Sequence, residues 1–297
     1  MSRYFATGLG GFVGRSIIQG LQSRGSLIAL DRSGRLAERH GLRVVRGELE
    51  QPETYRHALS GVDTVVHLAA ATGKASAGDH HRINVIGTET LVEACLTTGV
   101  RRLMFVSTIA VKFPDKRGYP YAQSKTDAER IVRQSELDFV IVRPTIVAGT
   151  GSPVMAGLCR LASLPLLPLF GGARARIQPI HVEDLAGLML SVLDEDRFAG
   201  DVLEFGGPEV ITIGKLLREL RLRVKGRAGP ALTIPLMPLL PMLRVLETIV
   251  GPGPLPVTAG QLSSFRFDGT IEPNRYHEQR RGSMHGIADI VAEAVPR

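Results

Sequence analysis

The sequence predicts an α/β protein with a doubly wound parallel sheet and a smaller, mixed C-terminal domain. Short apolar strands alternate with helical segments through the first half of the chain, and a glycine-rich turn joins the first strand to the first helix. The second half loses this alternation, and residues 149–172 are rich in Gly, Pro and Leu. We therefore expect one domain over residues 1–150, joined by a strand near residues 201–206, and a second mainly over residues 151–297.

Each expected element follows from an apolar pattern and from the residues that end it. The expected strands are a run before Gly8, then Leu27–Leu30, Arg43–Arg46, Asp63–Leu68, Arg102–Val106, Phe139–Val142, Ile177–His181 and Val202–Phe205. The expected helices are Ser16–Leu21, Glu53–Leu59, Ile83–Thr98, Tyr121–Ser135 and Glu183–Leu193. Strands that are apolar throughout are typical of a parallel sheet covered on both faces.

The turn after the first expected strand carries Gly8, Gly11 and Gly14 at a spacing of three residues. Glycines in such a turn let the backbone approach a ligand closely, and the N-terminus of the following helix offers unpaired N–H groups to negative charge. The pattern predicts a cradle for the pyrophosphate of a dinucleotide. Residues 1–150 are then the expected dinucleotide-binding domain, and residues 151–297 mainly a substrate domain.

An acidic residue ends the second expected strand. Asp31 stands about 20 residues after the glycines, where a carboxylate accepts hydrogen bonds from a ribose 2′-hydroxyl and repels a 2′-phosphate. This favours NAD. Arg32 and Arg35 follow at once and could instead bind the 2′-phosphate of NADP, so NADP stays an alternative.

Three side chains form a candidate catalytic group. Tyr121 and Lys125 are four residues apart and lie on one face of a helix, where an ammonium group beside a phenol lowers the pKa of the phenol. Such a tyrosine can exchange a proton with a substrate oxygen while hydride moves to or from a nicotinamide. Thr108 follows the strand that ends at Val106 and could hydrogen-bond the same oxygen.

These motifs together resemble the extended or atypical short-chain dehydrogenases/reductases, the NAD-dependent epimerase/dehydratase superfamily with its Rossmann sheet. The matching motifs run in order along the chain: Thr7–Gly14, Asp31, Gly47–Leu49, His67–Ala70, Asn84–Thr88, Val106–Thr108, Tyr121–Lys125, Arg143–Thr145, Ile180–Asp184 and Phe205–Pro208. Beyond about Lys225 the resemblance is much weaker.

The resemblance implies a role for each matching position. The pyrophosphate would lie on Gly8, Gly11 and Gly14, with backbone N–H groups from Phe12 and Val13, and Asp31 would bind the adenosine ribose. The other implied cofactor contacts are Glu48 and Leu49 at the adenine, Leu68, Ala69 and Ala70 along the cofactor, and Pro144 at the nicotinamide. Thr108, Tyr121 and Lys125 fill the catalytic positions, with Lys125 also holding the nicotinamide ribose.

The residues after the strand at Arg143 separate branches of this superfamily. Members that act on nucleotide sugars usually carry an asparagine and a Tyr-Gly-Pro turn there, whereas this chain has Arg-Pro-Thr-Ile-Val-Ala-Gly over residues 143–149. That form is more similar to the hydroxysteroid dehydrogenase, flavonoid reductase and complex I accessory-subunit branches. We expect an NAD(P)-dependent oxidoreductase or epimerase for a secondary alcohol or ketone, with an apolar small-molecule substrate. The alternatives are a dinucleotide-binding scaffold or redox sensor without turnover, and a nucleotide-sugar epimerase or dehydratase.

Composition limits the partners. The net charge of +7 comes from arginines spread along the chain, with no zinc finger, basic helix or RNA-binding aromatic motif, so we expect no nucleic-acid partner. The adjacent His80 and His81 have no carboxylate cluster beside them, and we expect no metal. The two cysteines form no disulfide framework, and we expect a cytoplasmic protein without a secretory leader.

Two expectations concern surfaces. The apolar segments 164–170 and 232–246 are expected to be core of the substrate domain, with a substrate pocket or peripheral membrane contact as the alternative. The resemblance also implies a possible homodimer, because helices equivalent to Ile83–Thr98 and Tyr121–Ser135 form a four-helix interface in many relatives.

Overall fold

The computed structural model describes residues 2–255 and 257–294. The chain folds into two compact units that are not continuous in sequence. Unit 1 comprises residues up to Val111, Tyr121–Arg143 and Ala186–Leu203, and unit 2 comprises Lys112–Pro120, Pro144–Leu185 and the residues from Glu204.

Unit 1 is built on a seven-stranded sheet with the strand order β11-β6-β5-β4-β1-β2-β3. Every adjacent pair from β6 to β3 is parallel. The strands are β1 (Ser2–Thr7), β2 (Gly25–Asp31), β3 (Leu42–Arg46), β4 (Thr64–His67), β5 (Arg102–Val106), β6 (Asp138–Pro144) and β11 (Val202–Phe205). From β1 the chain adds β2 and β3 on one side, and it then crosses to add β4, β5 and β6 on the other side. The switch point therefore lies between β1 and β4, and ligands bind at such a point in open α/β sheets. The predicted doubly wound α/β fold is confirmed.

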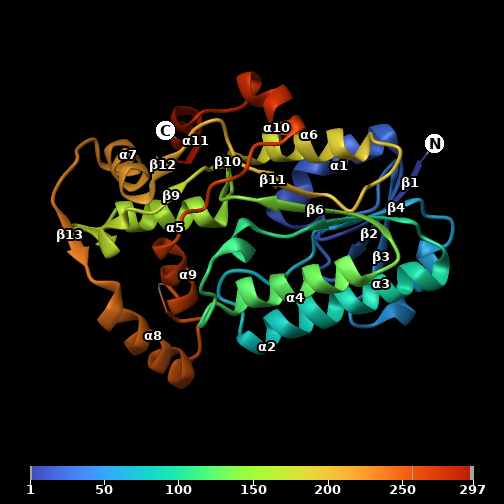
Figure 1. The fold of residues 1–297 in the computed structure, drawn as a ribbon, viewed down its shortest axis with the longest axis horizontal. Helices are drawn as coiled ribbons and strands as arrows, with labels where there is room; N and C mark the ends of the chain where they lie inside the picture. Colours follow the sequence, from blue (N-terminus) through green and yellow to red (C-terminus); the bar gives the residue numbers. More distant parts are fainter. Residues whose placement is uncertain (1, 256, 295–297) are drawn as a thin grey trace. The chain divides into compact units, whose positions relative to one another are not determined.

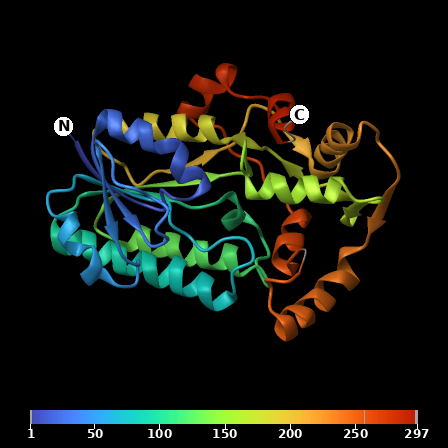
Figure 2. The ribbon, with the colours of Figure 1, turned by 180° about the vertical axis from the view of Figure 1, so that it is seen from behind.

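Helices cover both faces of this sheet (Figure 1). On one face lies α1 (Phe12–Arg24), which packs so closely on α6 (Val182–Leu193) that a Cβ on Gly20 would collide with Leu190. On the other face α3 (Gly87–Thr98) and α4 (Pro120–Gln134) lie side by side (Figure 2). Between that face and the sheet is a core that includes Phe5, Tyr55 and Phe105, none of them exposed.

Three predicted elements of the sequence differ in detail. The helix expected over Glu53–Leu59 is two short 3₁₀ segments, Pro52–Thr54 and Arg56–Leu59. The helix expected from Ile83 begins earlier, with one turn at α2 (Ala77–Asp79) and a π-helix over His80–Ile86 that runs into α3. The strand expected over Ile177–His181 is interrupted at Gln178 and Pro179, since proline cannot donate a ladder hydrogen bond.

Unit 2 is built from short two-stranded sheets and helices. Its strand pairs are β7 (Val147–Ala148) with β10 (Ile180–His181), β9 (Arg176–Ile177) with β12 (Ile211–Thr212), and β8 (Leu167–Phe170) with β13 (Ala231–Ile234). Its helices, beside the first turn of α6, are α5 (Pro153–Ala162), α7 (Ile213–Lys225), α8 (Leu236–Val250), α9 (Ala259–Ser263), α10 (Arg275–Arg280) and α11 (Ile287–Ala294). One apolar cluster joins α5, α7 and α11, and a second joins α8, α9 and Phe170. Among the described residues no helix is both long and apolar enough to cross a membrane.

Candidate dinucleotide and catalytic site

The glycine turn between β1 and α1 has the geometry of an anion cradle. Gly8 has a φ of +76°, and a Cβ there would lie 2.5 Å from the backbone nitrogen of Ala69. A Cβ on Gly14 would collide with the carbonyl oxygen of Gly8. The helix begins at Phe12 with no side chain capping its first turn and no acidic residue in it. The first N–H groups of α1, including those of Phe12 and Val13, are therefore suited to a phosphate oxygen.

Asp31 lies beside this cradle at the end of β2. A Cβ on Gly10 would be 3.9 Å from its Oδ1, and the side chain is only 4% exposed. Oδ1 accepts hydrogen bonds from the backbone and hydroxyl of Ser33, and Oδ2 accepts from Leu36 N and from Arg46 at 2.7 Å. Burial alone raises the pKa of Asp31, but these bonds outweigh it and hold the pKa below its usual value.

Arg46 is a residue that sequence reasoning missed. It is the last residue of β3, fifteen positions from Asp31, and the parallel register of β2 and β3 pairs the two directly. Arg32 and Arg35, which the sequence suggested for a 2′-phosphate, are exposed just beyond Asp31. The register of β2 and β3, which cannot be read from the sequence, brings Arg46 to the Asp31 carboxylate.

The other expected cofactor contacts, apart from Pro144, occupy two loops of unit 1. Glu48 and Leu49 follow β3, and the Leu49 side chain is buried in the core while its carbonyl accepts the hydroxyl of Tyr55. Leu68, Ala69 and Ala70 follow β4, where the N–H groups of Leu68 and Ala69 bond to Thr7. Pro144 is the buried last residue of β6 and belongs to unit 2.

Hydrogen bonds of His67, the last residue of β4, fix the carboxyl end of this strand. His67 is 1% exposed, its Nδ1 lies 2.7 Å from the Thr7 hydroxyl and its Nε2 lies 3.1 Å from the Thr88 hydroxyl. Burial, with a smaller effect from the charge of Lys125, lowers the pKa of His67 to about 3. Its imidazole is therefore neutral and holds the loop that faces Gly8.

Thr108, Tyr121 and Lys125 all belong to unit 1. The Thr108 hydroxyl hydrogen-bonds the side chain of Tyr121, at the first turn of α4. Lys125 is 2% exposed one turn later; its Nζ donates to the Val106 carbonyl at 2.7 Å and lies 4.0 Å from the centre of the Phe105 ring. The lysine is thus held at the carboxyl end of β5, the strand that precedes Thr108.

The pKa values of this pair differ from the sequence expectation. Burial raises the pKa of Tyr121 to about 12, and only the Thr108 hydrogen bond lowers it. Burial also lowers the pKa of Lys125 to about 7, although the charge of Glu129 favours the ammonium. The expected fall in the tyrosine pKa is therefore wrong for this structure, because the ammonium group bonds to a backbone carbonyl and burial dominates at the phenol.

The π-helix supplies contacts that sequence reasoning missed. His80 is 3% exposed, its ring centre lies 5.8 Å from that of Tyr121, and its Nδ1 lies 3.1 Å from the Ala71 carbonyl. Asn84 bonds to both the N–H and the carbonyl of Ala71 and donates to the Ser124 hydroxyl at 3.0 Å. These residues tie the loop after β4 to the first turns of α4, and a π-helix is often found at such functional sites.

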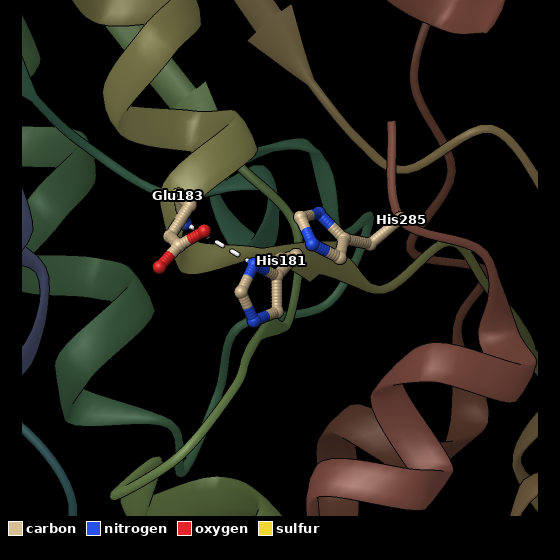
Figure 3. Close-up of side chains that lie close together, drawn as sticks. All are labelled: His181, Glu183 and His285. Atoms are coloured by element: carbon tan, nitrogen blue, oxygen red, sulfur yellow. Dashed lines mark hydrogen bonds between the residues drawn. The ribbon is translucent and has the colours of Figure 1, made fainter. Parts of the chain in front are cut away.

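A separate histidine cluster lies in unit 2 (Figure 3). The ring centres of His181 and His285 are 4.1 Å apart. One ring nitrogen of each histidine and one carboxylate oxygen of Glu183, the atom types that ligate metals, lie within 4.8 Å of one another. Nδ1 of His181 faces the Glu183 N–H at 3.4 Å, and its Nε2 lies 3.0 Å from Glu293. Both ring nitrogens of His181 are therefore engaged by the protein, and the cluster ties the start of α6 to the C-terminal segment.

Comparisons with known proteins place these features in a family. A family model described as NAD(P)H-binding matches residues 8–196. The 2-alkyl-3-oxoalkanoate reductase of Stenotrophomonas maltophilia is 30% identical over 207 residues, which is 62% of this chain and 63% of that protein. Mitochondrial NADH dehydrogenase [ubiquinone] 1 alpha subcomplex subunit 9 of Dictyostelium discoideum is 26% identical over 71% of this chain and 60% of that protein.

The solved structure of the Bordetella bronchiseptica enzyme WbmH in complex with NAD+ is similar over 99% of this chain and 97% of that one. Its TM-score is 0.73 at 19% identity, a likeness of fold. The chain spans between 51% and 63% of the first three curated relatives it matches. The matched residues 8–196 include the glycine turn, the loops after β3 and β4, and the candidate residues Thr108, Tyr121 and Lys125. This chain therefore belongs to the NAD(P)-binding, extended short-chain dehydrogenase/reductase and NAD-dependent epimerase/dehydratase superfamily.

Proposed function

We propose that this protein is an NAD(P)-dependent oxidoreductase that acts on a secondary alcohol or ketone of an apolar small molecule. The observation that carries the proposal is the hydrogen-bonded pair of Thr108 and Tyr121, with Lys125 one helical turn away in the same unit as the glycine cradle. Three relatives are named as reductases of oxoalkanoate, farnesyl quinoline oxide and ceramide compounds, and this supports an apolar ketone.

Tyr121, Thr108 and Lys125 each have a separate role in the proposed reaction. The nicotinamide, when bound, supplies or accepts the hydride. The Tyr121 hydroxyl donates a proton to the carbonyl oxygen of the substrate during reduction, and its pKa of about 12 keeps it protonated at neutral pH. In this proposal Thr108 hydrogen-bonds the same oxygen, and Lys125 holds a ribose hydroxyl of the cofactor.

The first experiment is a titration with NADH and with NADPH, followed by nicotinamide fluorescence. We expect NADH to bind more tightly, and Asp31→Ala to weaken NADH by at least about tenfold, because Asp31 would bond to the ribose. Preference for NADPH would instead assign cofactor choice to the arginines around Asp31, including Arg46. Binding of neither cofactor would contradict the proposal.

The second experiment measures turnover with 2-alkyl-3-oxo acids and, separately, with a nucleotide sugar. Tyr121→Phe is expected to lower kcat by about a hundredfold or more while NADH binding is kept, because the proton donor is lost. Tyr4→Phe, a buried tyrosine on β1, is the matched control and keeps activity. Epimerisation of the nucleotide sugar, without reduction of the oxo acid, would favour the epimerase alternative.

A dinucleotide-bound scaffold is the second candidate. The specific observation for it is that Lys125 does not lower the pKa of Tyr121, together with the likeness to a mitochondrial NADH dehydrogenase subunit. Tight NADH binding combined with no turnover on any tested ketone would favour this candidate over the enzyme.

A further inference from the structure

Helix α8 presents an apolar face to solvent. Met237 is 82% exposed, Met242 59%, Val245 60% and Ile249 73%. Met242, Val245 and Ile249 follow each other at helical spacing of three and four residues, so they line one side of the helix. Single exposed apolar residues are ordinary, but a continuous stripe of this kind marks an interaction surface.

The opposite side of α8 packs into the core of unit 2. Leu236, Leu240 and Leu243 are buried in the cluster with Phe170 and Leu262. Figure 1 shows α9 beside α8. The inner face therefore anchors the helix and leaves its outer face free of the unit 2 core.

The two charged residues of α8 are both hydrogen-bonded to the protein backbone. Arg244 donates to the Arg117 carbonyl at 3.0 Å, and Glu247 accepts from the Ala259 N–H at the start of α9. Neither charge interrupts the stripe formed by Met242, Val245 and Ile249. An uncharged outer face is suited to a hydrocarbon environment, where an unpaired charge is costly.

The strand before α8 also carries an exposed apolar side chain. Leu232 on β13 is 49% exposed. β13 pairs with β8 in a register that sets Ala231 against Leu167, next to Leu166, which is 41% exposed. Exposed apolar side chains thus occur on both β13 and α8, two elements adjacent in the chain.

Positive charge precedes this surface. Arg223, Lys225 and Arg227 are exposed where α7 ends and leads into β13. Residues 220–246 contain five arginines and lysines and no acidic residue. Of these five, Arg221 is buried and donates to the carbonyls of Ala162, Leu164 and Pro165, and Arg244 donates to the Arg117 carbonyl. The other three are the exposed residues Arg223, Lys225 and Arg227.

We propose that β13 and α8 dock this protein on the surface of a bilayer that contains anionic lipid, with the stripe in the acyl region and the three basic residues at the headgroups. Apolar insertion and basic attraction are the two signals that together give stable peripheral binding. The exposed basic residues that precede the stripe in the chain favour an anionic lipid surface over a protein partner, because peripheral membrane binding combines apolar and basic groups. The docking is independent of the proposed reaction.

Vesicle flotation tests the proposal with the full chain. We expect the protein to float with vesicles of phosphatidylcholine and phosphatidylglycerol, and less with phosphatidylcholine alone. Val245→Asp/Ile249→Asp is expected to lower the bound fraction by at least about tenfold, because charge enters the inserted face. The matched control, Val154→Asp/Val210→Asp, changes two comparably exposed apolar residues elsewhere in unit 2 and keeps binding.

The basic residues are tested separately. Arg223→Gln/Lys225→Gln/Arg227→Gln is expected to reduce binding to anionic vesicles to the level of neutral ones, whereas Arg197→Gln/Arg280→Gln/Arg281→Gln keeps the preference. Circular dichroism of each variant verifies that it is folded. Absence of vesicle binding by the wild type, or equal binding by the folded Val245→Asp/Ile249→Asp variant, overturns the proposal. It also falls if that variant only converts a dimer to a monomer, since the face is then a contact between copies.

Discussion

At the scale of single residues, Lys125 links the candidate site to stability. Its folded-state pKa of about 7 lies below the ordinary 10.5 because the ammonium group is buried. Between these values the unfolded chain binds more protons, so the free energy of unfolding rises with pH across this window. Below it, the cost of burying the charge is fully present.

The expected consequence is that Lys125→Met stabilises the protein near about pH 6, by on the order of 2 kcal/mol, and that the difference shrinks towards about pH 10. Chemical denaturation across this pH range measures it. Lys215→Met, which changes an exposed lysine on α7, serves as the control and shows no such trend. A variant that is less stable than the wild type at the acidic end would show that the Val106 and Phe105 contacts outweigh the burial of the charge.

Local sequence patterns were enough to choose the candidate site residues, but they did not predict the electrostatics of these residues. The glycines, Asp31 and the Thr108, Tyr121 and Lys125 set could be recognised because their chemistry depends on local spacing. The bond between Arg46 and Asp31 could not, since it depends on strand register. The raised pKa of Tyr121 could not either, because burial is a property of the folded chain.

At the scale of elements, the β1–α1 turn depends on the absence of a side chain at Gly14. A Cβ there would collide with the Gly8 carbonyl and lie 2.5 Å from the Leu9 Cα, both of them backbone atoms that cannot move aside cheaply. We expect Gly14→Ala to weaken NADH binding by at least about tenfold, because the displaced turn no longer presents its N–H groups.

Gly157→Ala is the matched control for this element. Gly157 lies inside α5, where a Cβ has no atom within 4 Å, so this substitution is expected to be neutral or slightly stabilising. Fluorescence titration measures binding and thermal unfolding measures stability for both variants. If Gly14→Ala bound NADH as the wild type does, the turn would not be the pyrophosphate cradle.

The elements that differ from the sequence prediction differ for identifiable reasons. Apolar periodicity places a helix over Ile83–Thr98, and α3 confirms its main part. The π-helix before it is stabilised by hydrogen bonds of His80 and Asn84 to the Ala71 carbonyl. These contacts depend on the tertiary fold, so no local sequence pattern predicts them. The segment expected as a helix at Glu53 is broken into 3₁₀ turns around the buried Tyr55, whose hydroxyl bonds to Leu49.

At the scale of the whole molecule, we propose that the chain forms a homodimer through α3 and α4. Glu89 and Glu93 are exposed on α3 four residues apart, and Arg130 and Arg133 are exposed on α4 three residues apart, so each pair lies on one side of its helix. These two helices lie side by side on one face of the sheet (Figure 2). A two-fold contact that brings α3 of one copy against α4 of the other would pair acidic with basic residues twice.

Charge reversal tests this arrangement. Sedimentation velocity of the wild type is expected to give a dimer that weakens at high salt, because exposed charge pairs are screened. Glu89→Lys/Glu93→Lys is expected to give a monomer, since lysines then face arginines across the contact. Adding Arg130→Glu/Arg133→Glu to that variant restores the pairing with opposite sign and should restore the dimer. A wild-type monomer at all concentrations would contradict the interface, and a dimer that survives the first charge reversal would place the contact on another surface.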